Sequence, residues 1–324
     1  MLVPMRAILA AADKYRYGQG AFNMNSVGQI EAAVRIHELL HSGAILQGAE
    51  ASNAFMGGEL DFMHGTLEAK KVGAKRIGDA VRKYGADSPV PIALHLDHGK
   101  SIESVKACID GGFTSVMIDG SHLALEENIK LTRQVVEYAH DHGVVVEGEL
   151  GRLAGVEDDV KVGDDDALYT DPDEVEEFVK ATGVDSLAIA IGTSHGAFKF
   201  KGKPHLRFDI LEKVSEKLPG FPIVLHGASS VMPEYVQMIN QYGGNIPGAQ
   251  GVPEEMLRQA ASMAVCKINI DSDLRLAMTA SIRKYFTEHP DHFDPRQYLG
   301  PGREAIKEMV KHKIVDVLGC DGKA

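Results

Sequence analysis

Three histidines stand at positions where a fold could gather them around one metal ion. Each follows an apolar run: His98 in His-Leu-Asp-His-Gly, His195 in Gly-Thr-Ser-His-Gly, and His226 in Leu-His-Gly-Ala-Ser. Three neutral imidazoles that leave one coordination position open are the ligand set of a catalytic zinc ion. If the three runs end at one place in the fold, the sequence predicts a zinc site there. His95 is the weaker ligand candidate, because it shares a strand face with Asp97.

Carboxylate and amide side chains stand at the ends of further apolar runs. Such groups can transfer protons to and from a bound substrate when they lie close to its reacting atoms. Because nearly every run ends in one, we expect them to line one catalytic mouth. They are Asn23, Asn25, Glu50, Asp97, Asp119, Glu149, Asn269 and Asp271.

Residues that suit a phosphate group follow the last three runs. Backbone N–H groups, hydroxyls and one ammonium can bind phosphate together, and barrel proteins often bind it after their last strands. The ammonium also supplies a local positive charge, which the net charge of −12 does not. The set is Gly196 with Lys199, Gly227 with Ser229, and Asn269 to Ser272.

The elements that must position these residues are eight apolar, β-branched runs separated by amphipathic stretches. Runs that are apolar on both faces and alternate with helices indicate a parallel sheet covered on both sides. Eight of them predict an α/β fold, a single-domain (β/α)8 TIM barrel, with an open doubly wound sheet as the alternative. The runs span residues 19–25, 44–50, 91–97, 115–119, 144–150, 186–191, 222–226 and 265–271.

The helical patterns and two further segments complete this expected organisation. We expect one domain over residues 1–324, with a long acidic active-site loop at about 151–170 and a C-terminal helical extension. A structureless loop of that length is usually functional or mobile. The helical patterns between the runs span residues 27–41, 102–110, 125–142, 173–182, 208–217, 233–242 and 253–263.

Composition limits the partners of the chain. Among 324 residues, 34 are Lys or Arg and 46 are Asp or Glu, and the resulting charge repels nucleic acid and anionic lipid. Three scattered cysteines suit a reducing compartment. There is no signal-peptide layout at the N-terminus and no run of about 18 apolar residues, so we expect a cytoplasmic protein that binds neither nucleic acid nor membrane.

Two local patterns point to other enzymes. His37-Glu-Leu-Leu-His41 matches the zincin pattern, but a barrel places it opposite the active-site mouth and no third ligand is spaced nearby. Gly192-Thr-Ser-His-Gly196 matches the nucleophile elbow of serine hydrolases, which a helix must follow. A basic loop with Gly and Pro follows here instead. Both alternatives are therefore disfavoured.

Several longer motifs occur in order and carry a family resemblance. They are Gly20-Ala-Phe-Asn, Leu96-Asp-His-Gly, Val146-Glu-Gly-Glu-Leu-Gly, Ile191-Gly-Thr-Ser-His-Gly, Leu225-His-Gly-Ala-Ser, Lys267-Ile-Asn-Ile-Asp-Ser-Asp-Leu-Arg and Asp294-Pro-Arg-Gln-Tyr-Leu. With these motifs, which span almost the whole chain, the sequence resembles the metal-dependent class II fructose-1,6-bisphosphate aldolases, nearer their shorter IIB branch. The resemblance implies reversible cleavage of fructose 1,6-bisphosphate to dihydroxyacetone phosphate and glyceraldehyde 3-phosphate in glycolysis and gluconeogenesis.

The resemblance also implies a role for each catalytic residue. His98, His195 and His226 would hold the zinc ion, and Asp119 and Glu149 would lie near an alternative position of the metal. Asp97 would exchange a proton with the C4 oxygen of the sugar. In the acidic loop, Glu157 would be the base that removes a proton from dihydroxyacetone phosphate.

Binding of the sugar phosphates is implied in the same way. Arg275 and Arg296 match groups that bind the far phosphate, and Arg296 would reach in from a neighbouring subunit, which implies a homo-oligomer of at least two chains. A monovalent cation, Na⁺ or K⁺, is expected near the phosphate loops. The residues expected to bind dihydroxyacetone phosphate are Asn23, Gly196, Lys199, Gly227, Ser229, Asn269, Asp271 and Ser272.

Substrate choice depends on one position. Related tagatose-bisphosphate aldolases tend to carry alanine where this chain has Asp271, so the resemblance favours fructose, with tagatose 1,6-bisphosphate as the alternative substrate. Many relatives have serine where this chain has Ala49, which puts one polar contact to the substrate in doubt. A zinc-dependent hydrolase on the same barrel and a non-catalytic scaffold role remain further alternatives.

Overall fold

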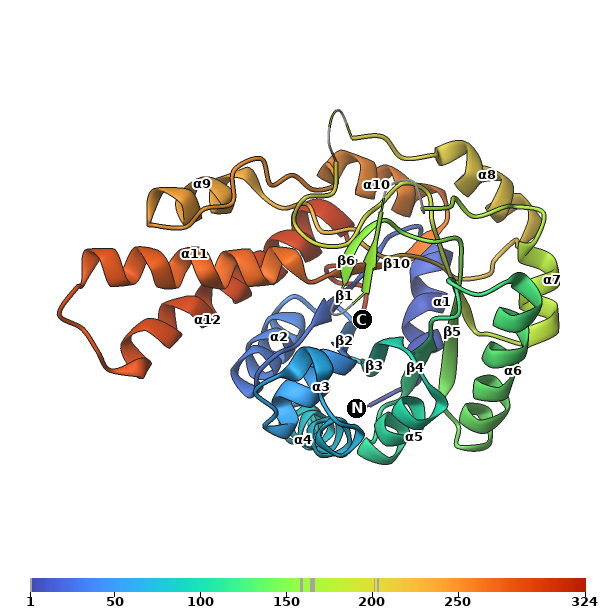
Figure 1. Ribbon diagram of the computed structural model, residues 1–324, viewed down its shortest axis with the longest axis horizontal. Helices are drawn as coiled ribbons and strands as arrows, with labels where there is room; N and C mark the ends of the chain where they lie inside the picture. The colour runs from blue at the N-terminus through green and yellow to red at the C-terminus, as the bar shows by residue number, and fades with distance from the viewer. Residues whose placement is uncertain (1, 158–159, 164–166, 201, 203) are drawn as a thin grey trace.

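Eight parallel strands close into a barrel in this computed structural model, which describes residues 2–157, 160–163, 167–200, 202 and 204–324 (Figure 1). The strands follow one another around the barrel in chain order, and β1 pairs with β10 to close it. The prediction of a TIM barrel is therefore confirmed, and the open doubly wound sheet is wrong. The strands are β1 (Gln19–Asn23), β2 (Ala44–Ala49), β3 (Ile92–Gly99), β4 (Ser115–Ile118), β5 (Val145–Leu150), β8 (Ser186–Ile189), β9 (Ile223–Leu225) and β10 (Val265–Ile270).

Helices cover the outside of the barrel, and those expected between the strands are present. Two of them begin at a serine N-cap: Ser26 accepts a hydrogen bond from the Gln29 N–H, and Ser101 accepts one from the Ser104 N–H. The expected helices are α2 (Val27–Leu39), α5 (Ile102–Gly111), α6 (Leu125–Asp141), α7 (Val175–Thr182), α8 (Phe208–Lys217), α9 (Pro233–Gln241) and α10 (Glu254–Met263).

Three α-helices and a short 3₁₀ turn lie where the sequence pattern indicated none. Glu50 was expected to end the second strand, but it begins α3 instead, so strand and helix join without a loop. The additional elements are α1 (Met5–Tyr15), α3 (Glu50–Gly57), the turn η1 (Phe62–His64) and α4 (Leu67–Gly85).

A C-terminal pair of helices extends away from the barrel. Helix α11 (Ser272–Glu288) runs outward from the end of β10, and α12 (Pro295–His312) returns beside it, so that the two form a projecting arm (Figure 1). The chain then continues as a π-helix, η3 (Lys313–Leu318), which contacts β1 and α10. None of the helices described is long and apolar enough to span a membrane.

The acidic segment at 151–170 was expected to be a structureless loop. Its described part instead contains two short antiparallel strands, β6 (Gly155–Glu157) and β7 (Val160–Val162), in which Glu157 pairs with Val160. Residues 158–159 and 164–166 lie outside the described residues. Backbone pairing therefore gives this excursion local structure of its own.

The barrel interior is more polar than the apolar runs indicated. Alternate residues along the strands face inward. Several of these inward residues carry polar or charged side chains that are fully buried, while the residues between them pack against the helices. The buried inward polar residues include Gln19, Gln47, His95, Glu147 and Lys267.

Candidate active site

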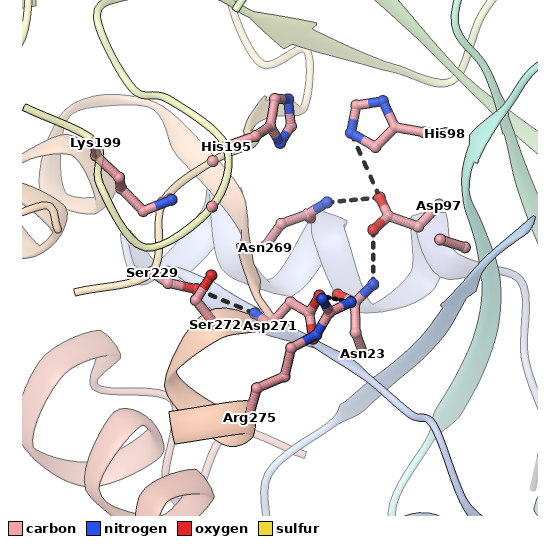
Figure 2. Close-up of a pocket in the computed structure, with 14 residues that line it drawn as sticks. Asn23, Asp97, His98, His195, Lys199, Ser229, Asn269, Asp271, Ser272 and Arg275 are labelled. Carbon is pink, nitrogen blue, oxygen red and sulfur yellow. Dashed lines mark hydrogen bonds and ion pairs between the residues drawn. The ribbon is translucent and has the colours of Figure 1, made fainter. Parts of the chain in front are cut away.

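A pocket opens at the carboxyl ends of the barrel strands, where the predicted residues meet. Figure 2 shows His98 and His195 along one side of it, Ser229, Ser272 and Arg275 on the opposite side, and Lys199 between. Almost all of the residues that line the pocket stand at the ends of strands or in the loops that follow them. The lining residues are Asn23, Ala49, Asp97, His98, His195, Gly196, Lys199, Gly227, Ala228, Ser229, Asn269, Asp271, Ser272 and Arg275.

The three predicted histidine rings lie together. The ring centroids of His98 and His226 are 4.4 Å apart, and those of His98 and His195 are 5.1 Å apart. His98 lies near the end of β3, where the pairing with β4 shifts register, and its φ of +46°, unusual for a residue other than glycine, breaks the regular alternation of side chains just after Asp97. A regular strand would direct neighbouring side chains to opposite faces of the sheet.

Two of the rings are oriented as metal-ligating imidazoles are. Nδ1 of His98 donates to Asp119 Oδ2 at 3.0 Å, and Nε2 of His226 donates to Glu147 Oε1 at 2.7 Å. With those protons placed, His98 Nε2 and His226 Nδ1 face each other as two lone pairs, 2.6 Å apart. A carboxylate on the far nitrogen is the usual second partner of a metal-bound histidine. This donor set fits a zinc ion.

Burial and the neighbouring groups together keep these side chains in the protonation states that a metal needs. Burial, with the charge of His98, lowers the pKa of His226, so its imidazole is neutral. Burial alone would raise the pKa of Asp119, but the hydrogen bond from His98 and its charge lower that pKa well below its ordinary value. Neutral imidazoles and ionised carboxylates are the ligand forms that bind divalent cations.

A second grouping of possible ligands overlaps the first. Ligand atoms of His98, Asp119 and Glu149 all lie within 4.8 Å of one another, as do those of Asp97, His98 and His226. Asp119 and Glu149 do not line the pocket itself. Asp119 Oδ2 lies 3.0 Å from His98 Nδ1, and Glu149 Oε2 lies 3.8 Å from His98 Nδ1 and 3.6 Å from His226 Nδ1. The two groupings share one imidazole, which is compatible with two alternative positions for one ion.

Asp97 is held by amide groups from three other strands. Its carboxylate accepts hydrogen bonds from Asn23 Nδ2 at 2.8 Å, Gln47 Nε2 at 3.1 Å and Asn269 Nδ2 at 2.8 Å. One oxygen lies 3.9 Å from His98 Nε2. The carboxylate is thus fixed beside His98 Nε2 and faces the pocket (Figure 2), where it can exchange a proton with a bound substrate.

Gln47 and a buried ion pair deeper in the barrel than the histidines were not predicted from the sequence. Gln47 also donates to Asn23 at 2.7 Å. Deeper in the barrel, Lys267 Nζ lies 3.0 and 3.2 Å from the two oxygens of Glu147, the carboxylate that orients His226. The one sequence feature that could have identified Gln47, Glu147 and Lys267 is that each is a polar residue at an inward position within an apolar run.

The other end of the pocket is built from backbone turns and hydroxyls. The Asp271 N–H donates to Ser229 Oγ at 3.1 Å, which joins the loops after β9 and β10. Gly227 has a φ of +58°, and a Cβ there would come within 2.7 Å of the Ser194 backbone. The Lys199 ammonium donates to the Ser194 carbonyl and lines the pocket. These groups can hold a phosphate.

Glu157 and Arg296 are not among the described residues that line the pocket. The side chain of Glu157 lies outside the described residues, although its backbone ends β6. Arg296 stands on α12 at the outer end of the arm, where its side chain is 91% exposed and pairs with Asp294 (Figure 1). Arg275 does line the pocket, paired with Asp271 at 2.6 Å.

Neither disfavoured motif forms a site. His37 is fully buried against the Phe22 ring, and neither it nor His41 belongs to a possible metal-binding group among the described residues. Ser194 donates its hydroxyl hydrogen bond to the Ala154 carbonyl, and the chain after it continues as a loop rather than a helix. A zincin site and a nucleophile elbow are therefore both unsupported.

The family model, the curated relatives and the solved structure described here all point to the same kind of enzyme. The family described as fructose-bisphosphate aldolase class-II matches residues 3–323. The chain is similar to the fructose-bisphosphate aldolase of Treponema pallidum, with 48% identity over all of this chain and 98% of the relative. It is 44% identical to that of Thermus caldophilus over the full length of both. The crystal structure of the YdjI aldolase from Escherichia coli K12 matches with a TM-score of 0.76, 28% identity and full coverage of both chains.

Proposed function

The chain belongs to the class II fructose-bisphosphate aldolase family, and we propose that a zinc ion on His98, His195 and His226 is its catalytic cofactor. The observation that carries this proposal is the pair of facing ring nitrogens of His98 and His226, each backed by a carboxylate. When bound, zinc supplies a Lewis acid that stabilises negative charge developing on the ketose oxygens as the carbon–carbon bond breaks. Asp119 and Glu149 are proposed to lie at an alternative position of the ion.

Asp97 is proposed to handle the proton at the C4 oxygen. In the cleavage direction it takes the proton of the C4 hydroxyl while the C3–C4 bond breaks, and the aldehyde product forms at C4. The three amide donors from Asn23, Gln47 and Asn269 support this role, because they fix the carboxylate in one orientation. Glu157 is proposed to return a proton to C3, which completes dihydroxyacetone phosphate.

The loops after β8, β9 and β10 are proposed to bind the ketose phosphate, with a monovalent cation nearby. Their turns and hydroxyls support this, because they present backbone N–H groups and a lysine to one end of the pocket. Arg275 and, from a neighbouring subunit, Arg296 are proposed to bind the far phosphate. The proposed ketose-binding residues are Asn23, Gly196, Lys199, Gly227, Ser229, Asn269, Asp271 and Ser272.

The biological setting is proposed on the same footing. We place the reaction in glycolysis and gluconeogenesis, in the cytoplasm, carried out by a homo-oligomer of at least two chains. The three cysteines are free and buried, which suits a reducing compartment. Fructose is the proposed sugar, because Asp271 is present at the pocket wall.

A cleavage assay on one zinc-loaded sample tests this function. We expect cleavage of fructose 1,6-bisphosphate to exceed that of tagatose 1,6-bisphosphate, and Asp271→Ala to reduce the difference. Borohydride added with substrate should trap no lysine, since no Schiff base is required. Faster cleavage of tagatose 1,6-bisphosphate would favour the tagatose alternative, equal cleavage would contradict a preference for fructose, and phosphate release without carbon–carbon cleavage would identify a hydrolase instead.

A further inference from the structure

A buried ion pair lies just behind the phosphate end of the pocket, outside the residues that line it. Lys313, the first residue of η3, and Asp273, in the first turn of α11, are both fully buried, and Lys313 Nζ lies 3.0 Å from Asp273 Oδ2. Asp273 follows directly after Asp271 and Ser272, which do line the pocket. The pair therefore connects the C-terminal segment to one of the two loops proposed to bind phosphate.

Asp273 also binds the backbone of the other loop, the one after β9. Its two carboxylate oxygens accept hydrogen bonds from consecutive N–H groups, Ser230 at 2.9 Å and Val231 at 2.6 Å. Lys313 Nζ donates to the Ser230 hydroxyl at 2.8 Å. Ser229, the residue just before, lines the pocket. One carboxylate and one ammonium thus hold the loop after β9 against the start of α11.

The loop held in this way is not in a relaxed conformation. Val231 has a φ of +51°, which is rare for a β-branched residue and persists only where surrounding contacts enforce it. Val231 is buried, and the N–H group that Asp273 binds is its own. On its far side Lys313 also donates to Glu254 Oε1 at 2.6 Å, which anchors the ammonium to α10. Removing the pair should therefore let the loop relax.

We propose that Lys313, acting through Asp273, is a positioning residue that sets the geometry of the phosphate end of the pocket. This inference rests on the proposed function, in which Ser229, Asp271 and Ser272 contact the ketose phosphate. Lys313 does not itself touch the substrate. Its contribution is to fix the loop after β9 so that the backbone N–H groups and the Ser229 hydroxyl converge on the phosphate. The metal end of the pocket, on the opposite wall, does not depend on it.

Lys313→Met tests the proposal, with Lys311→Met as the matched control. Lys311 lies two residues earlier, pairs with Glu308 at 3.7 Å and is half exposed. For Lys313→Met we expect KM for fructose 1,6-bisphosphate, and the Kd of dihydroxyacetone phosphate, to rise about tenfold, with kcat within about twofold and zinc content unchanged. Lys311→Met should change none of these values. A Lys313→Met protein with wild-type KM and Kd would overturn the proposal, as would a loss confined to kcat or zinc.

A second variant decides the question if Lys313→Met does not fold. Asp273→Asn keeps the shape of the side chain but replaces one of its two acceptor oxygens with an NH₂ donor, so one of the two backbone N–H groups loses its partner. It should raise the same KM and Kd, and adding Lys313→Met to it should cause little further rise if the lysine acts through Asp273. Additive effects, or wild-type ligand binding by Asp273→Asn, would contradict the proposal. The Kd of dihydroxyacetone phosphate is measured without turnover. Wild-type protein that binds this ketose phosphate but does not cleave the bisphosphate would therefore count against the proposed function and not against the role of Lys313.

Discussion

Glu147 does not line the pocket, yet it orients His226, one of the three proposed zinc ligands. It accepts the Nε2 hydrogen of His226 and is itself paired with Lys267, all three side chains being fully buried. Burial alone would raise the pKa of Glu147, but the charge of Lys267 and the hydrogen bond from His226 lower it below its ordinary value. A buried carboxylate of this kind fixes the tautomer of the imidazole.

Glu147→Gln should therefore weaken zinc binding. The neutral amide is a weaker acceptor for the His226 N–H, and it can also turn its own N–H₂ group toward the ring. We expect zinc affinity to fall about 10- to 100-fold, measured by competition with a chromogenic chelator. Glu137→Gln, at an exposed pair with Arg133, serves as the control and should bind zinc as the wild type does. Unchanged affinity in Glu147→Gln would exclude this orienting role.

His37, which lies outside the active site, makes the stability of the folded chain depend on pH. Its ring is fully buried, and burial lowers its pKa from 6.5 to about 4. Below pH 6.5 the unfolded chain takes up a proton that the folded chain does not accept until about pH 4. Stability is therefore lost as the pH falls through that window, by about 2 kcal/mol between pH 7 and pH 5.

Replacing that ring should remove its share of the acid sensitivity. His37→Leu keeps a similar apolar volume against Phe22 but cannot be protonated. Urea unfolding at pH 7 and pH 5 should show a smaller loss of free energy for this variant than for the wild type. His142→Leu, on the exposed end of α6, is the control and should leave the wild-type difference in place. An equal loss in all three proteins would show that other groups cause the acid sensitivity.

At the scale of elements, the loop after β9 depends on one glycine. Gly227→Ala would combine a left-handed backbone with a Cβ 2.7 Å from the Ser194 backbone. The loop must then move away from the loop after β8, and we expect KM for the bisphosphate to rise at least tenfold. Gly248 has a φ of +76° but open space around it, so Gly248→Ala isolates the backbone strain and should leave KM unchanged. Similar KM values in both variants would remove the close approach as the cause.

The elements that sequence analysis identified and those it missed differ for a physical reason. The strands were recognisable as short apolar runs between helical patterns, and the ends of the runs located Asp97 and the three histidines. Helix α4 was missed because its buried side is made largely of small residues, which give little apolar periodicity. Gly73 illustrates this: a Cβ there would meet the Asn53 backbone at 1.6 Å, so α3 and α4 pack in direct backbone contact.

The polar interior of the barrel could not be read from the same patterns. Gln47, Glu147 and Lys267 lie inside apolar runs, where a single polar residue does not reveal its partners. Each is hydrogen-bonded to a residue from another strand, such as Lys267 to Glu147, 120 positions away in the chain. Only closure of the barrel brings these side chains together. The same holds for Lys313, whose partners come from two other helices and a loop.

At the scale of the whole molecule, the arm formed by α11 and α12 projects from the barrel, and its outer end has no role in the site of its own chain. It carries Arg296 outward at the tip, where the residue pairs only locally with Asp294 among the contacts described. In the proposed oligomer this arginine completes the site of a neighbouring chain. The arm also presents exposed aromatic residues, including Phe286 and Phe293. Both features are suited to contact with another subunit.

Mixing two impaired variants, assayed at a substrate concentration well below the raised KM of Arg296→Ala, tests that sharing of residues. Arg296→Ala should raise KM for the bisphosphate strongly, and Asp97→Asn should abolish turnover. When the two are co-expressed, a mixed pair contains one site with an intact Asp97 and an Arg296 supplied by the neighbour, so activity should recover to a fraction of the wild type. Mixing Asp97→Asn with His98→Ala, which damage the same chain's site, should give no recovery. Equal activity in both mixtures would contradict a shared site.

Zinc titration of the metal-free protein is the most direct test of the central claim, that His98, His195 and His226 hold one catalytic ion beside the phosphate pocket. The protein is stripped with a chelator, and cleavage of fructose 1,6-bisphosphate is followed as zinc is returned. We predict no cleavage without metal, a linear recovery that stops at one zinc per chain, and no recovery in His226→Ala at the same zinc concentration. Cleavage that survives chelation, or recovery in His226→Ala equal to that of the wild type, would contradict the account.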